Sequence, residues 1–144
     1  MTAWPDGEPG VLRLPSGRSV RGRGVRRPAE FTAPEFGLYL LGRRPDRFAW
    51  PSRWVRWPDF GLPLDWPDAR SAVAEVWRRA ADSRVEVACG GGRGRTGTVL
   101  ACLTVLDGSA PGEAIDYVRE HYAASAVETP WQRWFVEWFA RQHR

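Results

Sequence analysis

A run of eight residues, Cys89–Thr96, constrains the fold of this chain more than any other feature. It reads Cys-Gly-Gly-Gly-Arg-Gly-Arg-Thr, so four of the five residues between its cysteine and its last arginine are glycines. The preceding segment, Val85–Ala88, is typical of a buried strand, and the nearly all-apolar segment that follows, Thr96–Leu106, is typical of a buried helix. The sequence therefore predicts a strand, a tight glycine-rich loop and a helix.

Three further helices are predicted from the spacing of apolar residues. Asp65 can cap the first, the second covers residues 112–122, and the third starts at Thr129. Short strands are predicted over Gly37–Leu41 and Arg53–Trp57. The last helix should present one broad apolar face, formed by Trp131, Trp134, Phe135, Trp138 and Phe139.

The order of these elements indicates an α/β fold. Strands that alternate with helices through short connections form parallel sheets, and the loops that follow such strands gather at one edge. A chain of 144 residues is long enough for one domain with a hydrophobic core. We therefore expect a single domain, residues 1–144, with a central, mostly parallel sheet flanked by helices. The loops after Trp57 and after Ala88 should meet at one edge of that sheet.

The amino-terminal segment, residues 1–36, is rich in glycine, proline and arginine. We expect it to be loosely structured, apart from a small hairpin of Val11–Leu14 and Arg18–Arg21 around Pro15-Ser16-Gly17. Its basic residues are Arg18, Arg21, Arg23, Arg26 and Arg27. They suggest either a nucleic-acid arm or a flexible basic surface. The absence of interleaved aromatic residues for base stacking favours the flexible surface.

Composition excludes some classes of function. All 21 basic residues are arginines, and without lysine the chain cannot form a Schiff base through a lysine side chain. A net charge of +4 favours anionic partners, such as phosphorylated protein, inositol phosphates, nucleic acid or a membrane surface.

No apolar run approaches the roughly 18 residues that span a bilayer, and Met1–Gly10 lacks the basic and apolar blocks of a signal peptide. We therefore expect a cytoplasmic protein.

The glycine-rich loop is suited to hold a phosphate group. Glycines let successive backbone amides turn toward a ligand, and the free amides at the start of the following helix add positive potential. That field also favours a thiolate at Cys89. Arg95 can hold two phosphate oxygens with its planar guanidinium, and Thr96 offers a hydroxyl to the sulfur. The predicted phosphate-binding residues are Gly90, Gly91, Gly92, Arg93, Gly94 and Arg95.

The run Cys89–Thr98 resembles the signature loop of the cysteine-dependent protein-tyrosine phosphatase superfamily, which includes the dual-specificity enzymes. The resemblance extends from about Leu38 to the last helix. It implies that Cys89 is the nucleophile, that Arg95 holds the phosphoryl group, and that a Trp-Pro-Asp loop supplies the general acid. Asp59 ends such a triplet 30 residues before the cysteine.

The resemblance also points to a catalytic glutamine. The family has a glutamine that positions water, and Gln132 stands at the matching place. Two features depart from the family. Ala88 replaces the histidine that normally precedes the cysteine, and the basic tyrosine-containing loop of tyrosine-specific members is not found in a chain without lysine or asparagine.

Several of these residues also have simpler interpretations. Cys102 lies two turns inside an apolar helix, where a packed thiol is favoured over a redox role. Among the three Trp-Pro-Asp triplets, Asp68 can serve the first turn of a helix, whereas Asp59 has no evident capping role. Gln132 either positions water or reaches back to the backbone of Thr129 in a capping box. Arg93 either adds a second cation beside the phosphate or is a solvated side chain.

The sequence thus predicts a metal-free and cofactor-free protein phosphatase that acts on phosphotyrosine, with phosphoserine and phosphothreonine tolerated, through a phosphocysteine intermediate. Its predicted partners are a phosphorylated protein substrate and an oxyanion in the loop, with no membrane span and no nucleic acid. One alternative is a phosphoinositide or RNA 5′-phosphatase, suggested by Arg93 and by the basic amino-terminal segment. Others are a non-catalytic phosphate-binding module and a nucleotide-binding P-loop protein, although the latter would need a glycine in place of Cys89 and a lysine in place of Arg95.

Overall fold

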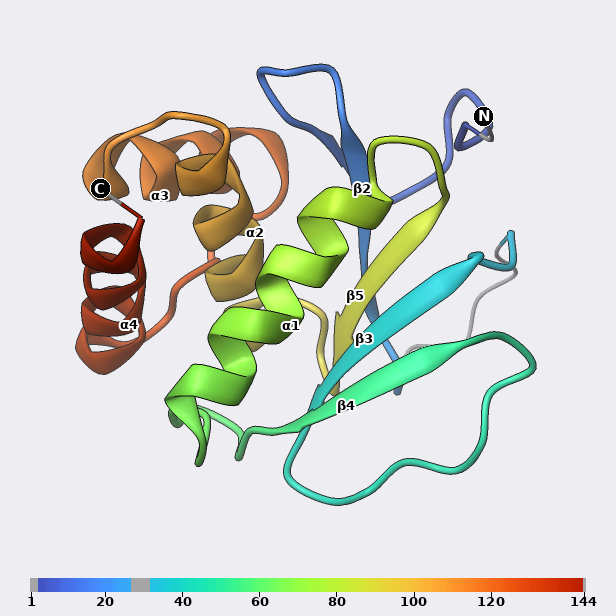
Figure 1. The fold of residues 1–144 in the computed structure, drawn as a ribbon, viewed down its shortest axis with the longest axis horizontal. Helices are drawn as coiled ribbons and strands as arrows, with labels where there is room; N and C mark the ends of the chain where they lie inside the picture. Colours follow the sequence, from blue (N-terminus) through green and yellow to red (C-terminus); the bar gives the residue numbers. More distant parts are fainter. Residues whose placement is uncertain (1–2, 27–31, 144) are drawn as a thin grey trace.

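Five strands form one sheet in the order β1-β2-β5-β3-β4 (Figure 1). The computed structural model describes residues 3–26 and 32–143. Only β1 runs antiparallel to its neighbour, so the other four strands end at the same edge of the sheet. The strands are β1 (Val11–Arg13), β2 (Ser19–Gly24), β3 (Phe36–Leu41), β4 (Ser52–Arg56) and β5 (Val85–Cys89). The predicted mostly parallel α/β sheet is confirmed.

The helices lie on one face of this sheet. In Figure 1, α1 covers β3 and β4, α2 covers β5 and β2, and α3 and α4 flank α2. Asp65 caps α1 by accepting a hydrogen bond from the amide of Asp68, and Thr129 caps α4 through the amide of Gln132. All four predicted helices are therefore confirmed, within a few residues at each end. They are α1 (Trp66–Arg79), α2 (Gly94–Leu106), α3 (Pro111–His121) and α4 (Pro130–Gln142).

The apolar face of α4 is narrower than predicted. Phe135 and Phe139 are fully buried, and Trp138 is partly buried against the core. Trp131 and Trp134 are 40% and 60% exposed, because they lie on the side of the helix that turns away from α2. Within the described residues, no helix is both long and apolar enough to cross a membrane.

The expectation of a loosely structured segment over residues 1–36 is wrong for the part that the structure describes. The predicted hairpin forms between β1 and β2, and β2 then pairs in parallel with β5, so it lies inside the sheet. Val20 is buried beside Val85, and Arg21 is only 1% exposed. Arg27 lies outside the described residues. Pairing with a distant strand, which local composition does not reveal, orders this segment.

Buried ion pairs explain how an arginine-rich strand fits inside the sheet. The carboxylate of Glu86 on β5 accepts hydrogen bonds from Arg21 Nη2 at 2.5 Å and from Arg23 Nε at 2.6 Å. It also accepts one from Tyr39 Oη at 2.7 Å, and Trp50 Nε1 donates to that same hydroxyl. Burial would raise the pKa of Glu86, but Arg23, Tyr39 and Arg21 outweigh it and hold the pKa below its usual value. Two arginines expected on a flexible basic surface are thus part of a buried cluster.

Glu86→Gln is expected to lower the free energy of unfolding by about 3–5 kcal/mol, because it leaves buried guanidinium groups without their carboxylate. Urea unfolding at pH 7 measures this change. Since the pKa of Glu86 is depressed in the folded state, the stability it contributes is present above the unfolded carboxyl pKa and is lost as the pH falls through the folded value. The variant should therefore lose less stability than the wild type on acidification.

The isosteric change Asp116→Asn, at an exposed position of α3, is the matched control and should alter stability by less than about 0.5 kcal/mol. Equal stability of the Glu86 and Asp116 variants would contradict a structural role for the buried ion pairs.

Candidate active site

The glycine-rich loop connects β5 to α2 and surrounds the thiol of Cys89. Cys89 is 2% exposed, and its Sγ accepts a hydrogen bond from the amide of Gly92 at 3.2 Å. Gly92 has φ +79°, and a Cβ there would lie 2.4 Å from the amide nitrogen of Gly24, so only glycine fits. The amide of Gly92 therefore faces the sulfur, two residues before α2 begins.

Neighbouring segments hold this loop in place. The chain that follows β2 continues along it, because the amide of Val25 donates to Cys89 O at 2.9 Å and the amide of Arg26 donates to Gly90 O at 3.2 Å. On the other side, the hydroxyl of Tyr122 donates to Gly92 O. Such anchoring makes the loop a preorganised cradle for an anion.

Arg95 lies under the loop with part of its guanidinium unused. Its Nη1 donates to Leu40 O at 3.1 Å and to Trp57 O at 2.9 Å, which fixes the plane of the group. Its Nη2 lies 3.3 Å from Asp59 Oδ1. Nε of Arg95 and the hydroxyl of Thr96 are buried, and neither has a hydrogen-bond partner within the described part of the chain. A bound phosphate oxygen would satisfy the guanidinium donor, and the hydroxyl is available to a sulfur or to an oxyanion.

A cleft of about 340 Å³ opens above Arg95 at the carboxyl edge of the sheet. The segments that follow β2, β3, β4 and β5 all contribute to it, since these parallel strands end side by side. The lining residues are Val25, Arg26, Leu41, Gly42, Arg43, Asp59, Gly90 and Arg95. A site that binds and transforms an anion fits this position.

Of the three Trp-Pro-Asp triplets, the one at residues 57–59 reaches the cleft. Trp57 is fully buried and donates from Nε1 to Gly61 O at 2.7 Å, so its ring anchors the loop that carries Asp59. The side chain of Asp59 is 45% exposed and faces Arg95. Asp68 instead pairs with Arg53 at 2.8 Å, at the start of α1. Asp59 is therefore the aspartate of the three whose position suits a proton donor.

Gln132 lies beneath the Asp59 loop and is fully buried. Its Oε1 accepts a hydrogen bond from the amide of Glu128 at 2.9 Å, and its Nε2 lies 3.4 Å from Gly61 O. Gln132 therefore caps the amide of Glu128, whereas the capping box predicted that it would cap the amide of Thr129, one residue later. In this arrangement Gln132 connects the start of α4 to the loop of Asp59.

Glu128 borders the glycine-rich loop, although no sequence pattern indicated it. Its carboxylate lies against the loop, because a Cβ built on Gly94 would come 1.8 Å from Glu128 Oε1. Partial burial and the nearby charge of Asp59 raise the pKa of Glu128, and Arg95 acts in the opposite direction. A periodicity argument could not find this residue, since it stands in the turn before α4 and reaches the loop only through tertiary contact.

Three other positions that the sequence singled out, Arg93, Cys102 and Ala88, are not part of the cleft lining. Arg93 is exposed and does not line it, whereas Arg26 and Arg43, which the motif did not single out, do. Cys102 is fully buried in α2, and burial raises the pKa of its thiol, as expected for a packed cysteine. Ala88, which stands in place of the family's histidine, is fully buried in β5 beside Arg23 and Tyr39 in the sheet register.

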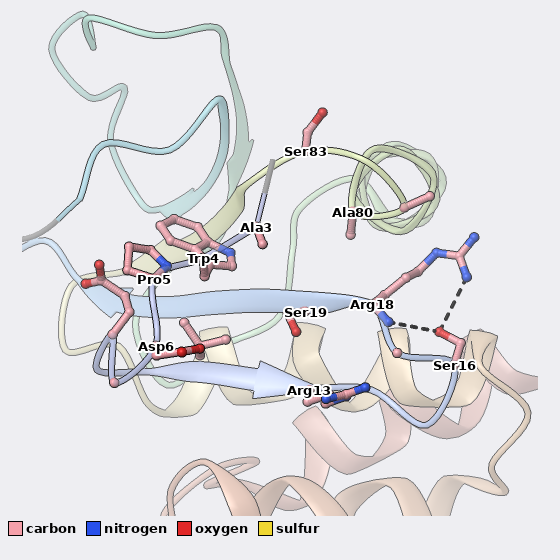
Figure 2. Close-up of a pocket in the computed structure, with 15 residues that line it drawn as sticks. Ala3, Trp4, Pro5, Asp6, Arg13, Ser16, Arg18, Ser19, Ala80 and Ser83 are labelled. Carbon is pink, nitrogen blue, oxygen red and sulfur yellow. Dashed lines mark hydrogen bonds between the residues drawn. The ribbon is translucent and has the colours of Figure 1, made fainter. Parts of the chain in front are cut away.

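A larger cavity, of about 670 Å³, lies at the opposite end of the sheet. Figure 2 shows Trp4 and Pro5 on one side of it and Arg18 and Ser19, at the start of β2, on the other. Because β2 and β5 begin at this edge and end at the other, the cavity is remote from Cys89. Its lining holds neither cysteine nor histidine. We therefore assign the chemistry to the smaller cleft.

Comparison with known proteins agrees with this geometry. The profile of a family described as "PTP-SAK: Swiss Army Knife protein, DSP-PTPase phosphatase domain" matches residues 67–133. Two uncharacterised proteins of Methanocaldococcus jannaschii, MJ0215 and MJECL20, are 40% and 41% identical to the chain over 87 residues, 60% of its length. The chain matches 53% and 57% of the length of these two relatives, so it spans about half of each.

Solved structures share the fold. Tk-PTP in its active form superposes with a TM-score of 0.67 at 22% identity, over 76% of this chain and 80% of that one. Kinase-associated phosphatase, in a form whose catalytic cysteine is replaced by serine, gives 0.62 at 18% identity, over 75% and 69%. PTPMT1 in complex with PI(5)P gives 0.54 at 16% identity, over 75% and 77%. The solved structures show that the chain has the fold of these phosphatases, and the family profile over residues 67–133 supports its place in the cysteine-dependent protein-tyrosine phosphatase superfamily, which includes the dual-specificity phosphatases.

Proposed function

We propose that this protein hydrolyses phosphotyrosine in proteins through a phosphocysteine intermediate, and that it tolerates phosphoserine and phosphothreonine. One observation carries the proposal. Arg95 and Asp59 line the same cleft together with Gly90, the residue that follows Cys89, and Nε of Arg95 is buried without a partner in the described structure. A thiol, a phosphate-holding guanidinium and a proton donor are what a two-step phosphoryl transfer requires.

In the first step the Cys89 thiolate attacks phosphorus. The S–P bond forms as the bond from phosphorus to the tyrosine oxygen breaks, and Asp59 gives its proton to that oxygen. Arg95 and the loop amides hold the equatorial phosphate oxygens, whose charge they stabilise in the transition state. The leaving group departs as a neutral phenol.

In the second step a water molecule attacks the phosphocysteine. The O–P bond forms, the P–S bond breaks, and the proton of the water passes to the carboxylate of Asp59. The hydroxyl of Thr96 donates to the departing sulfur. Gln132 supports this step by holding the Asp59 loop through Gly61.

Asp59→Ala is expected to slow phosphotyrosine hydrolysis by about 100-fold, since a phenolate with a pKa near 10 leaves poorly unless it is protonated. The loss should grow with the pKa of the leaving group and be small for activated aryl phosphates. The alkaline limb of the pH profile should disappear as well. Rates on a series of aryl phosphates of increasing leaving-group pKa test this expectation.

The matched control is Asp68→Ala, because Asp68 ends the same tripeptide but pairs with Arg53 at the start of α1. That variant should lose about 1 kcal/mol of stability and keep the leaving-group dependence of the wild type. If Asp68 rather than Asp59 controlled the leaving-group slope, the acid would be misassigned.

A phosphoinositide phosphatase is the second candidate, favoured by the two additional arginines at the cleft. PTPMT1, whose fold this chain resembles, has been crystallised with PI(5)P. Initial rates on a phosphotyrosyl peptide and on a soluble inositol phosphate, measured at equal concentration, separate the two. A faster rate on the peptide supports the proposed function, and a faster rate on the inositol phosphate overturns its choice of substrate. Binding of both without turnover would indicate a non-catalytic phosphate-binding module.

A further inference from the structure

The cleft has an excess of positive charge beyond that of Arg95. Arg26 and Arg43 also line it, and Asp59 is the one acidic residue of the lining among the residues that the structure describes. The bound phosphate group would occupy the donors of Arg95 and of the loop, which leaves the two additional arginines to act on another part of the substrate.

Backbone pairing fixes the position of Arg26. Its amide donates to Gly90 O, which continues the alignment of β2 with β5 past the end of the sheet. Its guanidinium lies flat against the loop, since a Cβ on Gly90 would come 2.7 Å from Arg26 Nη2. Arg26 Nη2 also lies 3.9 Å from Asp59 Oδ2. The charge of Arg26 is therefore held at the mouth of the cleft, although the side chain is 69% exposed.

Arg43 reaches the same mouth from a different strand. It stands two residues after the end of β3 and is exposed, and no hydrogen bond or ion pair involves it within residues 3–26 and 32–143. The carboxylate of Asp59 already faces Arg95 with one oxygen and Arg26 with the other. Nothing in the described cleft therefore neutralises Arg43.

We propose that Arg26 and Arg43 form a subsite for a second anionic group, and that the preferred protein substrate carries an acidic or phosphorylated residue next to its phosphotyrosine. This inference rests on the proposed function. A guanidinium binds carboxylate and phosphate alike through paired N–H donors, so either residue type supplies the required chemistry. A peptide is favoured as the carrier because both arginines lie at the exposed rim, where a chain that inserts its phosphotyrosine would place the neighbouring side chains.

Binding to the Cys89→Ser protein tests the subsite without turnover. The probes are fluorescent phosphotyrosyl peptides with flanking alanines, flanking aspartates or a flanking phosphoserine, and the readout is Kd by fluorescence anisotropy. We expect the two anionic peptides to bind about fivefold more tightly than the alanine peptide, which is the size of effect that exposed ion pairs produce. The ratio of the two Kd values should be smaller at high salt, because salt screens exposed charges. Arg26→Gln combined with Arg43→Gln should bring the ratio close to one. Arg44→Gln, at an exposed neighbour that faces Trp54 instead of the cleft, should keep it.

Three results would overturn the subsite: equal affinity for the alanine and anionic peptides, a preference that survives in the double variant, or a preference that Arg44→Gln removes. An arginine-dependent preference for an inositol bisphosphate over the monophosphate, without any preference among peptides, would overturn the peptide substrate. If the alanine peptide binds no better than its unphosphorylated form, the proposed function itself fails. Arg43→Gln alone keeps the test valid if the double variant unfolds, since Arg43 is exposed and makes no hydrogen bond or ion pair within the described residues.

Discussion

Cys89→Ser is expected to lower turnover by at least about 10,000-fold while phosphate binding is retained. The loop amides, the start of α2 and the guanidinium of Arg95 all remain in place, because the substitution replaces one atom. A serine hydroxyl is a far weaker nucleophile than a thiolate at neutral pH and accepts the phosphoryl group poorly. Steady-state rates on a phosphotyrosyl peptide measure the loss of turnover. The Kd of inorganic phosphate shows whether binding is retained.

The second cysteine provides the control for this variant. Cys102 is buried in α2, so Cys102→Ala should affect stability and leave turnover near the wild-type value. Substantial hydrolysis by Cys89→Ser, or a large loss of rate in the Cys102 variant, would contradict a thiolate mechanism at Cys89.

Arg95→Lys is expected to lower kcat/KM by about 1,000-fold, although the positive charge is conserved. The guanidinium uses Nη1 to hold Leu40 O and Trp57 O, and directs its other edge to the cleft. An ammonium group cannot anchor itself to these carbonyls and also offer two parallel N–H donors to a phosphate. Removing a preorganised donor from a developing oxyanion typically costs about 100- to 1,000-fold, and here two donors are lost together.

The same exchange at Arg44 is the control, since Arg44 is exposed beside Trp54 and does not line the cleft. Arg44→Lys should keep the wild-type kcat/KM for a phosphotyrosyl peptide. Near-normal rates for Arg95→Lys would show that this side chain does not hold the phosphoryl group.

The loop, the helices and the helix-capping position of Asp68 could be inferred from the sequence because each depends on local order. Four glycines next to a cysteine and an arginine impose a tight turn, and the apolar run after them forms a buried helix with few alternatives. Capping preference likewise distinguished Asp68, beside its cap Asp65, from Asp59. Each of these patterns is contained in a stretch of about 15 consecutive residues, so it can be recognised without knowing which distant segments pack together.

The tertiary structure alone decided how the amino-terminal segment contributes to the sheet and to the cleft. Val20 pairs with Val85, 65 residues later in the chain, and this parallel pairing brings Arg26 beside Gly90. Read locally, the arginines of β2 indicate a solvated surface, because their partner Glu86 is equally distant in sequence.

The same distinction applies to the rim of the cleft. Arg43 reaches the cleft from the end of β3, and Glu128 reaches Gly94 of the glycine-rich loop from the turn before α4; neither belongs to a recognisable motif. The sequence by itself determined the glycine-rich loop and the α/β class, since short-range periodicity and glycine content specify both. Which charges surround that loop was decided by the tertiary structure, because parallel strands bring together residues that are far apart in the chain.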